Sequence, residues 1–275
     1  MRYTYDAAAR RGELHIYEAI GSGLFGNGAS PADVAAALEQ MRGAAELHVY
    51  LSSAGGSVFD GVAIYNSLRR FPGRKTVHVE GLAASIASLV ALAGDRRVSA
   101  RTSMWMVHDP SSVCVGGAKD MERTAEQIRN VRSMMVDVYC ERTGRARSDI
   151  EAWLTAETWM DARTATERGF SHEVTAQDGP AAFDASCASL LSQYTHTPEA
   201  LRIAASATKG LPMNIAAPVT SSPAPDRSAR MLEDFTKDAE KKLAAAGGWK
   251  PTPPSDRSRE ESADYLRKVA AGGGR

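Results

Sequence analysis

Apolar and polar side chains alternate in three short stretches, residues 13–17, 47–51 and 75–80, which is the pattern of half-buried strands. The first of these predicts an edge strand or the first strand of a sheet. Residues 58–68 instead place apolar side chains three or four positions apart, which predicts a helix with one buried face. Strand followed by helix, repeated without hairpin signals, predicts an α/β fold with a largely parallel sheet.

An earlier helix has a clear start signal. It follows a glycine-rich connector at 21–28, which we expect to be flexible, and Ser30 is its expected cap. Pro31 suits the first helical position, and Asp33 places a negative charge in the first turn, where the helix dipole favours it.

Residues 118–142 carry a longer helical repeat, with apolar residues at Met121, Ala125, Ile128, Val131, Met135 and Val138. This helix is longer than a small core requires. A capping box at Ser148 and Glu151 predicts another helix that runs to about 155. A third helix is expected from Asp161 to Arg168, and residues 171–174 return to a strand.

The composition changes at about Gln177 to alanine, serine, threonine and proline, which is typical of linkers. We therefore expect a folded domain at 1–176 and a largely disordered tail at 177–275. Residues 228–246 and 258–271 have helical patterns within this tail. Neither has enough apolar area to fold alone, so we expect them to be mobile or to dock on a partner.

Charge and cysteine content narrow the class of protein. Lysine plus arginine and aspartate plus glutamate both number 33, so bulk charge favours neither nucleic acid nor a membrane as partner. Three distant cysteines show no disulfide framework, which suits a reducing cytoplasm. The N-terminus lacks a signal-peptide core, and no apolar run is long enough to span a bilayer. We expect a soluble, cytoplasmic protein.

No metal or cofactor is expected. The histidines at positions 15, 48, 78, 172 and 196 have no partner set at ligand spacing. His15, His48 and His78 lie in predicted strands, where ordinary half-buried histidines explain them.

The candidate chemistry begins in residues 81–94, where small and apolar side chains surround Ser85. A strand precedes them, so residues 81–84 predict a turn and Ser85 the start of a helix. A serine in this place is most often only an N-cap. A helix start also offers unpaired N–H groups and a partial positive charge, which favour the oxyanion that forms when a serine attacks a carbonyl.

A base and a second glycine-rich turn are found at the ends of other predicted strands. The short apolar strand within residues 102–110 ends at His108 and is stopped by Pro110. The strand at 47–51 runs into Gly55 and Gly56 before the next helix. This glycine pair is consistent with an ordinary strand-to-helix turn, and a phosphate-binding role is weak because no Gly-Lys-Ser/Thr follows. Catalytic groups are usually displayed at such strand ends.

Three motifs together resemble the proteolytic subunit of the Clp protease, ClpP: Ser53-Ala-Gly-Gly-Ser57, Gly81-Leu-Ala-Ala-Ser85 and Met106-Val-His-Asp-Pro110. Residues 58–68 and 159–169 resemble more closely the ClpP-like prohead proteases of tailed bacteriophages. The resemblance runs from about Glu13 to Val174.

This resemblance implies a ClpP/crotonase-like fold of repeated β-β-α units with a long handle helix at 118–142. In ClpP that helix interlocks two rings, so a homo-oligomeric ring is implied. Ser85 would be the nucleophile and His108 the general base. The N–H groups of Gly56 and Ile86 would form the oxyanion hole.

The third catalytic residue has more than one candidate, because the sequence departs from the family. The position of the catalytic aspartate falls on Glu157, which can accept the imidazole N–H in the same way. Asp161 is the competing candidate, although it fits better as a helix cap. Asp109 is a poor third choice, since adjacent side chains on a strand point apart.

The sequence thus predicts a serine endopeptidase. The resemblance to prohead proteases implies that it matures phage scaffold and capsid proteins in the host cytoplasm or the prohead. The alternatives are a housekeeping ClpP that works with a Clp ATPase and a crotonase-type enzyme acting on acyl-CoA. A further alternative is a non-catalytic capsid assembly protein, against which the intact candidate triad argues.

Overall fold

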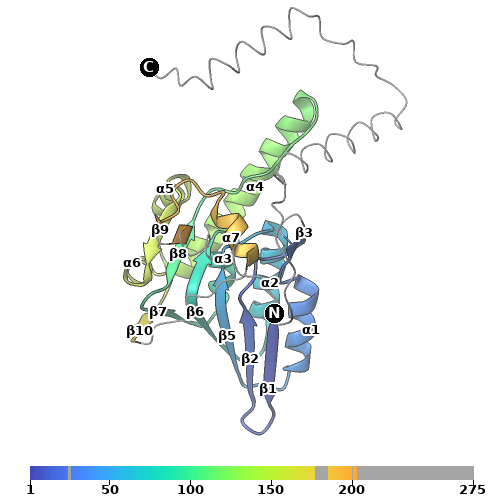
Figure 1. Cartoon of the computed structure of the whole chain (residues 1–275), viewed down its shortest axis with the longest axis vertical. Helices are drawn as coiled ribbons and strands as arrows, with labels where there is room; N and C mark the ends of the chain where they lie inside the picture. The colour runs from blue at the N-terminus through green and yellow to red at the C-terminus, as the bar shows by residue number, and fades with distance from the viewer. Residues whose placement is uncertain (24–25, 177–184, 200, 203–275) are drawn as a thin grey trace, which may run out of the picture. The chain divides into compact units, whose positions relative to one another are not determined.

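The protein is described by a computed structural model that covers residues 1–23, 26–176, 185–199 and 201–202 (Figure 1). The strands are β1 Arg2–Asp6, β2 Arg11–Ile16, β3 Ser22–Gly23, β4 Gly26–Asn27, β5 Glu46–Ser53, β6 Arg74–Ala84, β7 Arg96–Ala100, β8 Met104–Val107, β9 Thr158–Asp161 and β10 Glu173–Thr175. The helices are α1 Pro31–Gln40, α2 Val58–Arg70, α3 Ile86–Ala91, α4 Ala118–Thr143, α5 Arg147–Thr155, α6 Ala162–Glu167 and α7 Ala185–Leu191.

Eight strands form one sheet in the order β1-β2-β5-β6-β7-β10, and β8 pairs with both β6 and β9. Every pair from β2 to β10 along this order is parallel. The expected α/β fold with a largely parallel sheet is confirmed. The sequence did not reveal β1, which forms an antiparallel hairpin with β2, or β9, which pairs antiparallel with β8.

The main core lies between the sheet and α1, α2 and α3. Alternate residues of β5, namely Leu47, Val49 and Leu51, are fully buried against these helices, as the alternation predicts. Their neighbours His48 and Tyr50 face the other side of the sheet and are only partly buried. The described fold therefore has one face covered by helices and one that is more open.

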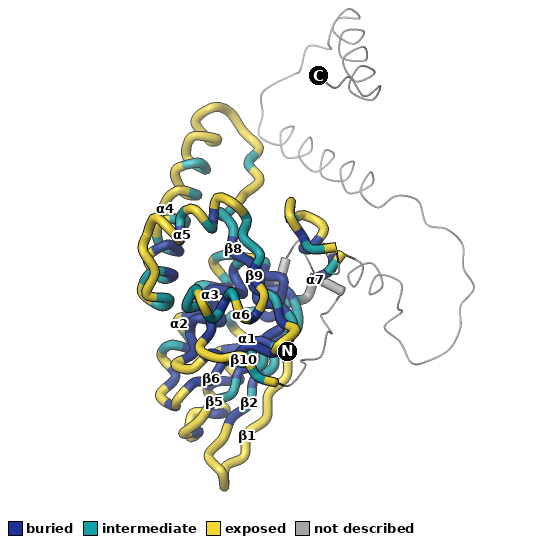
Figure 2. Tube along the Cα trace, turned by 90° about the vertical axis from the view of Figure 1, so that its left-hand side faces the viewer, coloured by how far each residue is buried: buried dark blue, intermediate teal, exposed yellow. Residues whose placement is uncertain are grey.

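The long helix α4 extends away from the sheet, and its far end is exposed (Figure 2). Its buried residues are Met135, Val136 and Tyr139, all in its second half. The helix predicted at 118–142 is confirmed, because α4 spans Ala118–Thr143. The first half of α4 has no buried residue and packs little against the core of its own chain.

Two of the three predicted helix caps are confirmed. Ser30 accepts from the N–H of Asp33, and Asp161 accepts from that of Thr164. The capping box at Ser148 is wrong, because α5 begins at Arg147 and the residue at its N-cap is Ala146. With the helix starting earlier, Ser148 lies inside the first turn, and the Glu151 carboxylate bonds to Arg147 instead.

The two helical patterns at 228–246 and 258–271 lie outside the described residues, and the boundary at 176 stays a prediction. None of the described helices is long and apolar enough to span a bilayer.

Candidate active site

Ser85 occupies the single residue between β6 and α3, with backbone angles φ 54° and ψ −130°. A positive φ is strained for a residue with a side chain and is typical of functional sites. The strand and the helix hold it there, because its N–H donates to the Met106 carbonyl at 2.9 Å and its own carbonyl accepts from the Ser88 hydroxyl at 2.6 Å. Ser85 stands at the N-cap position of α3, as expected for the start of a helix, but its side chain makes no capping bond.

The hydroxyl of Ser85 instead meets the ring of His108, with 2.7 Å between Oγ and Nε2. The sheet creates this contact, because the last residues of β6 pair in parallel with β8 and both strands end at the same edge. His108 directly follows β8. The structure therefore brings together the two residues that the sequence proposed as nucleophile and base.

The environment of His108 favours its neutral form. Burial lowers the pKa of its imidazole, and the nearby charges of Glu157 and Asp109 raise it by less. A neutral ring can accept the proton of Ser85 at Nε2, which is what a general base requires.

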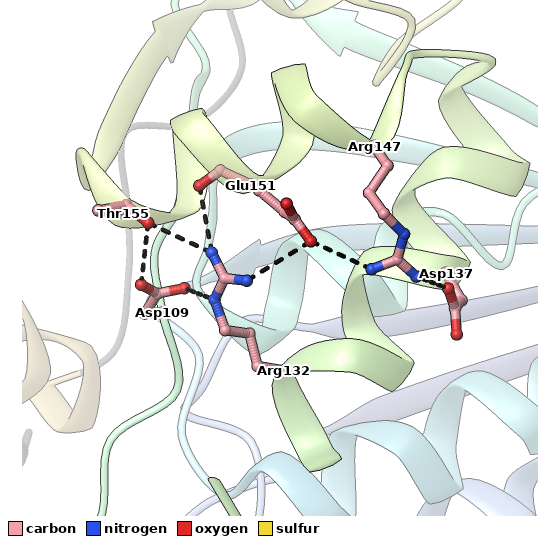
Figure 3. A network of polar contacts seen from close by, with 6 residues as sticks. All are labelled: Asp109, Arg132, Asp137, Arg147, Glu151 and Thr155. Carbon is pink, nitrogen blue, oxygen red and sulfur yellow. Dashed lines mark hydrogen bonds and ion pairs between the residues drawn. The ribbon is translucent and has the colours of Figure 1, made fainter. Parts of the chain in front are cut away.

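The loop after His108 is fixed by a network of ion pairs (Figure 3). Arg132 of α4 donates to the Asp109 carboxylate at 2.6 Å, and Thr155 of α5 donates to the same group at 3.2 Å. Arg132 also contacts Glu151, which pairs in turn with Arg147. The Asp109 carboxylate is therefore bonded to Arg132 and Thr155 rather than to the imidazole.

Glu157 precedes β9, with a positive φ of 46°. The antiparallel register pairs Thr158 with Val107, so Glu157 lies at the end of β9 that is next to His108. Asp161 pairs with Met104 at the opposite end and caps α6. Of the two acids, Glu157 is thus the one that lies beside the base.

The Glu157 carboxylate is bound elsewhere in this structure. It accepts from the main-chain N–H groups of His196 at 2.6 Å and Thr195 at 2.9 Å, and from the indole of Trp159 at 3.3 Å. Burial raises its pKa, but these donors outweigh burial and bring the pKa below its ordinary value. Among the described atoms, no hydrogen bond joins it to His108.

The glycine-rich turn lies against the serine. Gly55 has φ 96°, and a Cβ there would lie 2.7 Å from the Cβ of Ser85. Gly56 has φ 144°, and a Cβ there would lie 2.2 Å from the carbonyl oxygen of Ile20. Both positions therefore require glycine. Within the described part of the chain, the N–H groups of Gly56 and Ile86 have no hydrogen-bond partner, so both are free to donate.

The sequence missed one component of the site, the segment from α7 to Thr197. Tyr194 donates its hydroxyl to the Ala54 carbonyl at 2.6 Å, and its ring packs edge-on against His108 with 5.1 Å between centroids. The apolar spacing of Cys187, Leu190 and Leu191 was the available signal, but the alanine- and serine-rich composition around it suggested a linker.

The other histidines form no metal site. His48 and His78 hydrogen-bond to each other at 3.0 Å, and Tyr50 stacks on His78 and His15 across the open face of the sheet. Among the residues that the structure describes, no group of three His, Cys, Asp or Glu side chains is placed to hold a metal ion.

Comparison with known proteins gives one family. A family model described as Clp protease matches residues 32–178. The chain is 32% identical over 138 residues to an ATP-dependent Clp protease proteolytic subunit of Chlorella vulgaris, covering 50% of this chain and 67% of that protein. It is 37% identical over 123 residues to the corresponding subunit 1 of Chlamydia abortus, covering 43% and 64%.

The fold matches a solved structure as well. A mutant of ClpP1 from Listeria monocytogenes superposes with a TM-score of 0.54 at 21% identity, covering 62% of this chain and 94% of that one. This likeness concerns the fold alone.

Proposed function

The chain belongs to the Clp protease family, whose members are serine endopeptidases, and we propose that it cleaves peptide bonds through an acyl-enzyme on Ser85. The observation that carries this proposal is the 2.7 Å contact between Oγ of Ser85 and Nε2 of His108. The serine in this contact has a strained backbone, and burial favours the neutral form of the imidazole. The N–H groups of Gly56 and Ile86 lie nearby as donors for the oxyanion.

The reaction follows from these positions. Nε2 of His108 takes the hydroxyl proton as Oγ of Ser85 attacks the carbonyl carbon of the substrate. The resulting oxyanion accepts from the N–H groups of Gly56 and Ile86. When the C–N bond breaks, His108 gives the proton to the departing amine. A water molecule then repeats the two steps and frees the carboxylic acid, so no cofactor is required.

Glu157 is the proposed third member of the triad. It lies at the His108 end of β9, and its charge raises the pKa of that ring. Such a carboxylate stabilises the imidazolium that forms during attack. To do this, it must turn from the N–H groups of Thr195 and His196 toward the imidazole.

Substitutions at the candidate residues test the mechanism. Ser85→Ala should abolish hydrolysis of a fluorogenic peptide and labelling by a fluorophosphonate, with the melting temperature retained.

Glu157→Gln should lower kcat by about 10³ to 10⁴, whereas Asp161→Asn should leave kcat nearly unchanged. A Ser85→Ala protein that still cleaves peptides would contradict the assignment, and an inactive Asp161→Asn with an active Glu157→Gln would move the acid to Asp161.

For the biological role, we propose maturation of phage scaffold and capsid proteins by a homo-oligomeric ring, in the host cytoplasm or inside the prohead. Residues 58–68 and 159–169 resemble prohead proteases, and a long C-terminal segment follows the family match, which ends at 178. Co-expression with a phage capsid protein should yield capsid fragments that the Ser85→Ala protein does not produce.

A housekeeping role is the second candidate, because both curated relatives are named ATP-dependent Clp protease subunits. In that role, the protein should degrade a folded substrate only when ATP and a Clp ATPase are added. Native mass measurement would test the ring in either role. Crotonase-type chemistry on acyl-CoA has no need of a serine bonded to a histidine, so the Ser85–His108 contact favours the protease.

A further inference from the structure

The segment from α7 to Thr197 covers the open face of the sheet next to the serine. Side chains along a strand point alternately to opposite faces. Ala83 and Trp105 join the core under α1 to α3, whereas Leu82, Ala84 and Met106 join a second cluster. The residues of the segment in this second cluster are Cys187, Ala188, Leu190 and Leu191, with Tyr194 packed beside them. Figure 2 shows α7 on the other side of the strands from α2 and α3.

The same segment occupies the main-chain groups that precede the glycine pair. The N–H of Ala54 donates to Sγ of Cys187 at 3.4 Å, and the carbonyl of Ala54 accepts from the Tyr194 hydroxyl at 2.6 Å. An extended substrate beside β5 would pair with such free main-chain groups. Both groups of Ala54 are already taken.

The segment also contacts the base and the candidate acid. The Tyr194 ring lies against His108, and the N–H groups of Thr195 and His196 bind the Glu157 carboxylate. Ala54, His108 and Glu157 adjoin the ends of β5, β8 and β9, and one short stretch of chain therefore contacts all three. A stretch that served only to cover the sheet would not need these polar contacts.

We propose that residues 185–197 are an autoinhibitory plug, which blocks the approach to Ser85 and keeps the Glu157 carboxylate from His108 until substrate displaces it. This inference rests on the serine protease function proposed above. Displacement uncovers an apolar strip of Leu82, Ala84 and Met106 beside the serine and frees the Ala54 main chain at the same time. A substrate strand replaces both sets of contacts, so binding and activation are one event.

Weakening the plug tests the proposal. In the full chain, Tyr194→Ala should raise kcat/KM on a fluorogenic peptide about tenfold or more, because it removes one hydrogen bond and its ring packing from the closed state. The matched control is Gln193→Ala, which changes an exposed neighbour in the same segment and should leave kcat/KM unchanged. Melting curves of both variants check that the fold is retained.

Fluorophosphonate labelling distinguishes a failure of the plug proposal from a failure of the proposed protease function. If Ser85 reacts in neither the wild type nor the variants and no peptide is cleaved, the protease function itself is wrong. If Ser85 reacts and Tyr194→Ala cleaves at the wild-type rate or more slowly, the plug is overturned and the protease stands.

A second measurement does not depend on the folding of Tyr194→Ala. Cys187 belongs to the plug and is fully buried where the plug packs on the sheet, so its reaction with a thiol reagent reports opening. In a Ser85→Ala chain that also carries Cys114→Ser and Cys140→Ser, a saturating peptide should speed this reaction about tenfold or more. A peptide that binds without speeding it would overturn the proposal.

Discussion

At the scale of single residues, the site depends on backbone conformations that side chains rarely adopt. Ser85 and Glu157 both have positive φ, and together with Arg10 they are the non-glycine residues of the described chain that do. Ser85 keeps this conformation because its N–H and its carbonyl are both bonded to neighbouring elements. The strain turns its hydroxyl toward His108 instead of toward the first turn of α3.

The buried state of His108 predicts the pH dependence of activity. Its pKa is lowered from the ordinary value of 6.5, mainly by burial, and only the neutral ring can act as base. The acid limb of kcat/KM against pH should therefore have its midpoint below 6.5. Glu157→Gln removes a charge that raises this pKa, so its midpoint should be lower still.

A pH profile of both proteins checks this expectation. A midpoint above 6.5 in the wild type would contradict the burial argument, and an upward shift in Glu157→Gln would contradict the placement of that carboxylate beside the ring.

At the scale of elements, the ends of several helices meet around one buried arginine. Arg97 of β7 is 3% exposed, and its guanidinium donates to the carbonyls of Gly94, Arg142, Gly169 and Phe170. These carbonyls lie at the C-terminal ends of α3, α4 and α6, where helices leave acceptors unpaired. Burial, together with the charge of Arg142, lowers the pKa of Arg97 to about 10.

Removing this side chain should be costly. Arg97→Met leaves the carbonyls of Arg142, Gly169 and Phe170 without this donor, whereas that of Gly94 still accepts from the Arg142 side chain. We therefore expect a loss of about 3 kcal/mol in the free energy of unfolding, or roughly 10 °C in melting temperature. The matched control is Arg96→Met, whose ion pair with Glu173 is exposed and should contribute little, so its melting temperature should stay close to that of the wild type. Equal losses in the two variants would show that the buried carbonyls are satisfied in another way.

The sequence predicted the elements that have strong periodicity or a terminal signal. The parallel strands, α1 with its Ser30 cap, α2 and α4 belong to this group, and the pairing of Ser85 with His108 followed from motif order. It did not reveal β9, because four residues at 158–161 are too few for a period. The sequence analysis missed α7 because the burial of Cys187 and Leu191 depends on contacts with residues of distant strands. The carboxylate contacts of Glu157 depend on the same docking.

At the scale of the whole molecule, the two faces of the sheet differ in character. One packs on α1 to α3, and the other carries a row of stacked rings, His15, Tyr50, His78 and His48. His78 is the most perturbed of these, since burial, the nearby His48 and the charges of Arg96 and Arg11 lower its pKa to about 4. An open face lined with neutral imidazoles is sensitive to acid.

This face predicts how stability changes with pH. Because the pKa of His78 is lower in the folded protein than in the unfolded chain, the unfolded state binds more protons as pH falls from about 6.5 to about 4. The stability present above pH 6.5 should therefore decline in this window. His78→Phe should reduce the difference in unfolding free energy between pH 7.5 and pH 5 by on the order of 1 kcal/mol, allowing for partial exposure. Urea melts at both pH values measure it, and an unchanged difference would assign the decline to other groups.

The strand β9 has four residues, and the residues at both of its ends are needed in place. Glu157 directly precedes the strand, and Asp161, its last residue, caps α6. Loss or gain of one residue there would exchange Trp159 and Met160 between the two faces and carry the acid away from the histidine. Evolution therefore has little freedom to vary the length of this strand. Related chains should accumulate insertions and deletions elsewhere, for example in the exposed turn at residues 7–10 between β1 and β2.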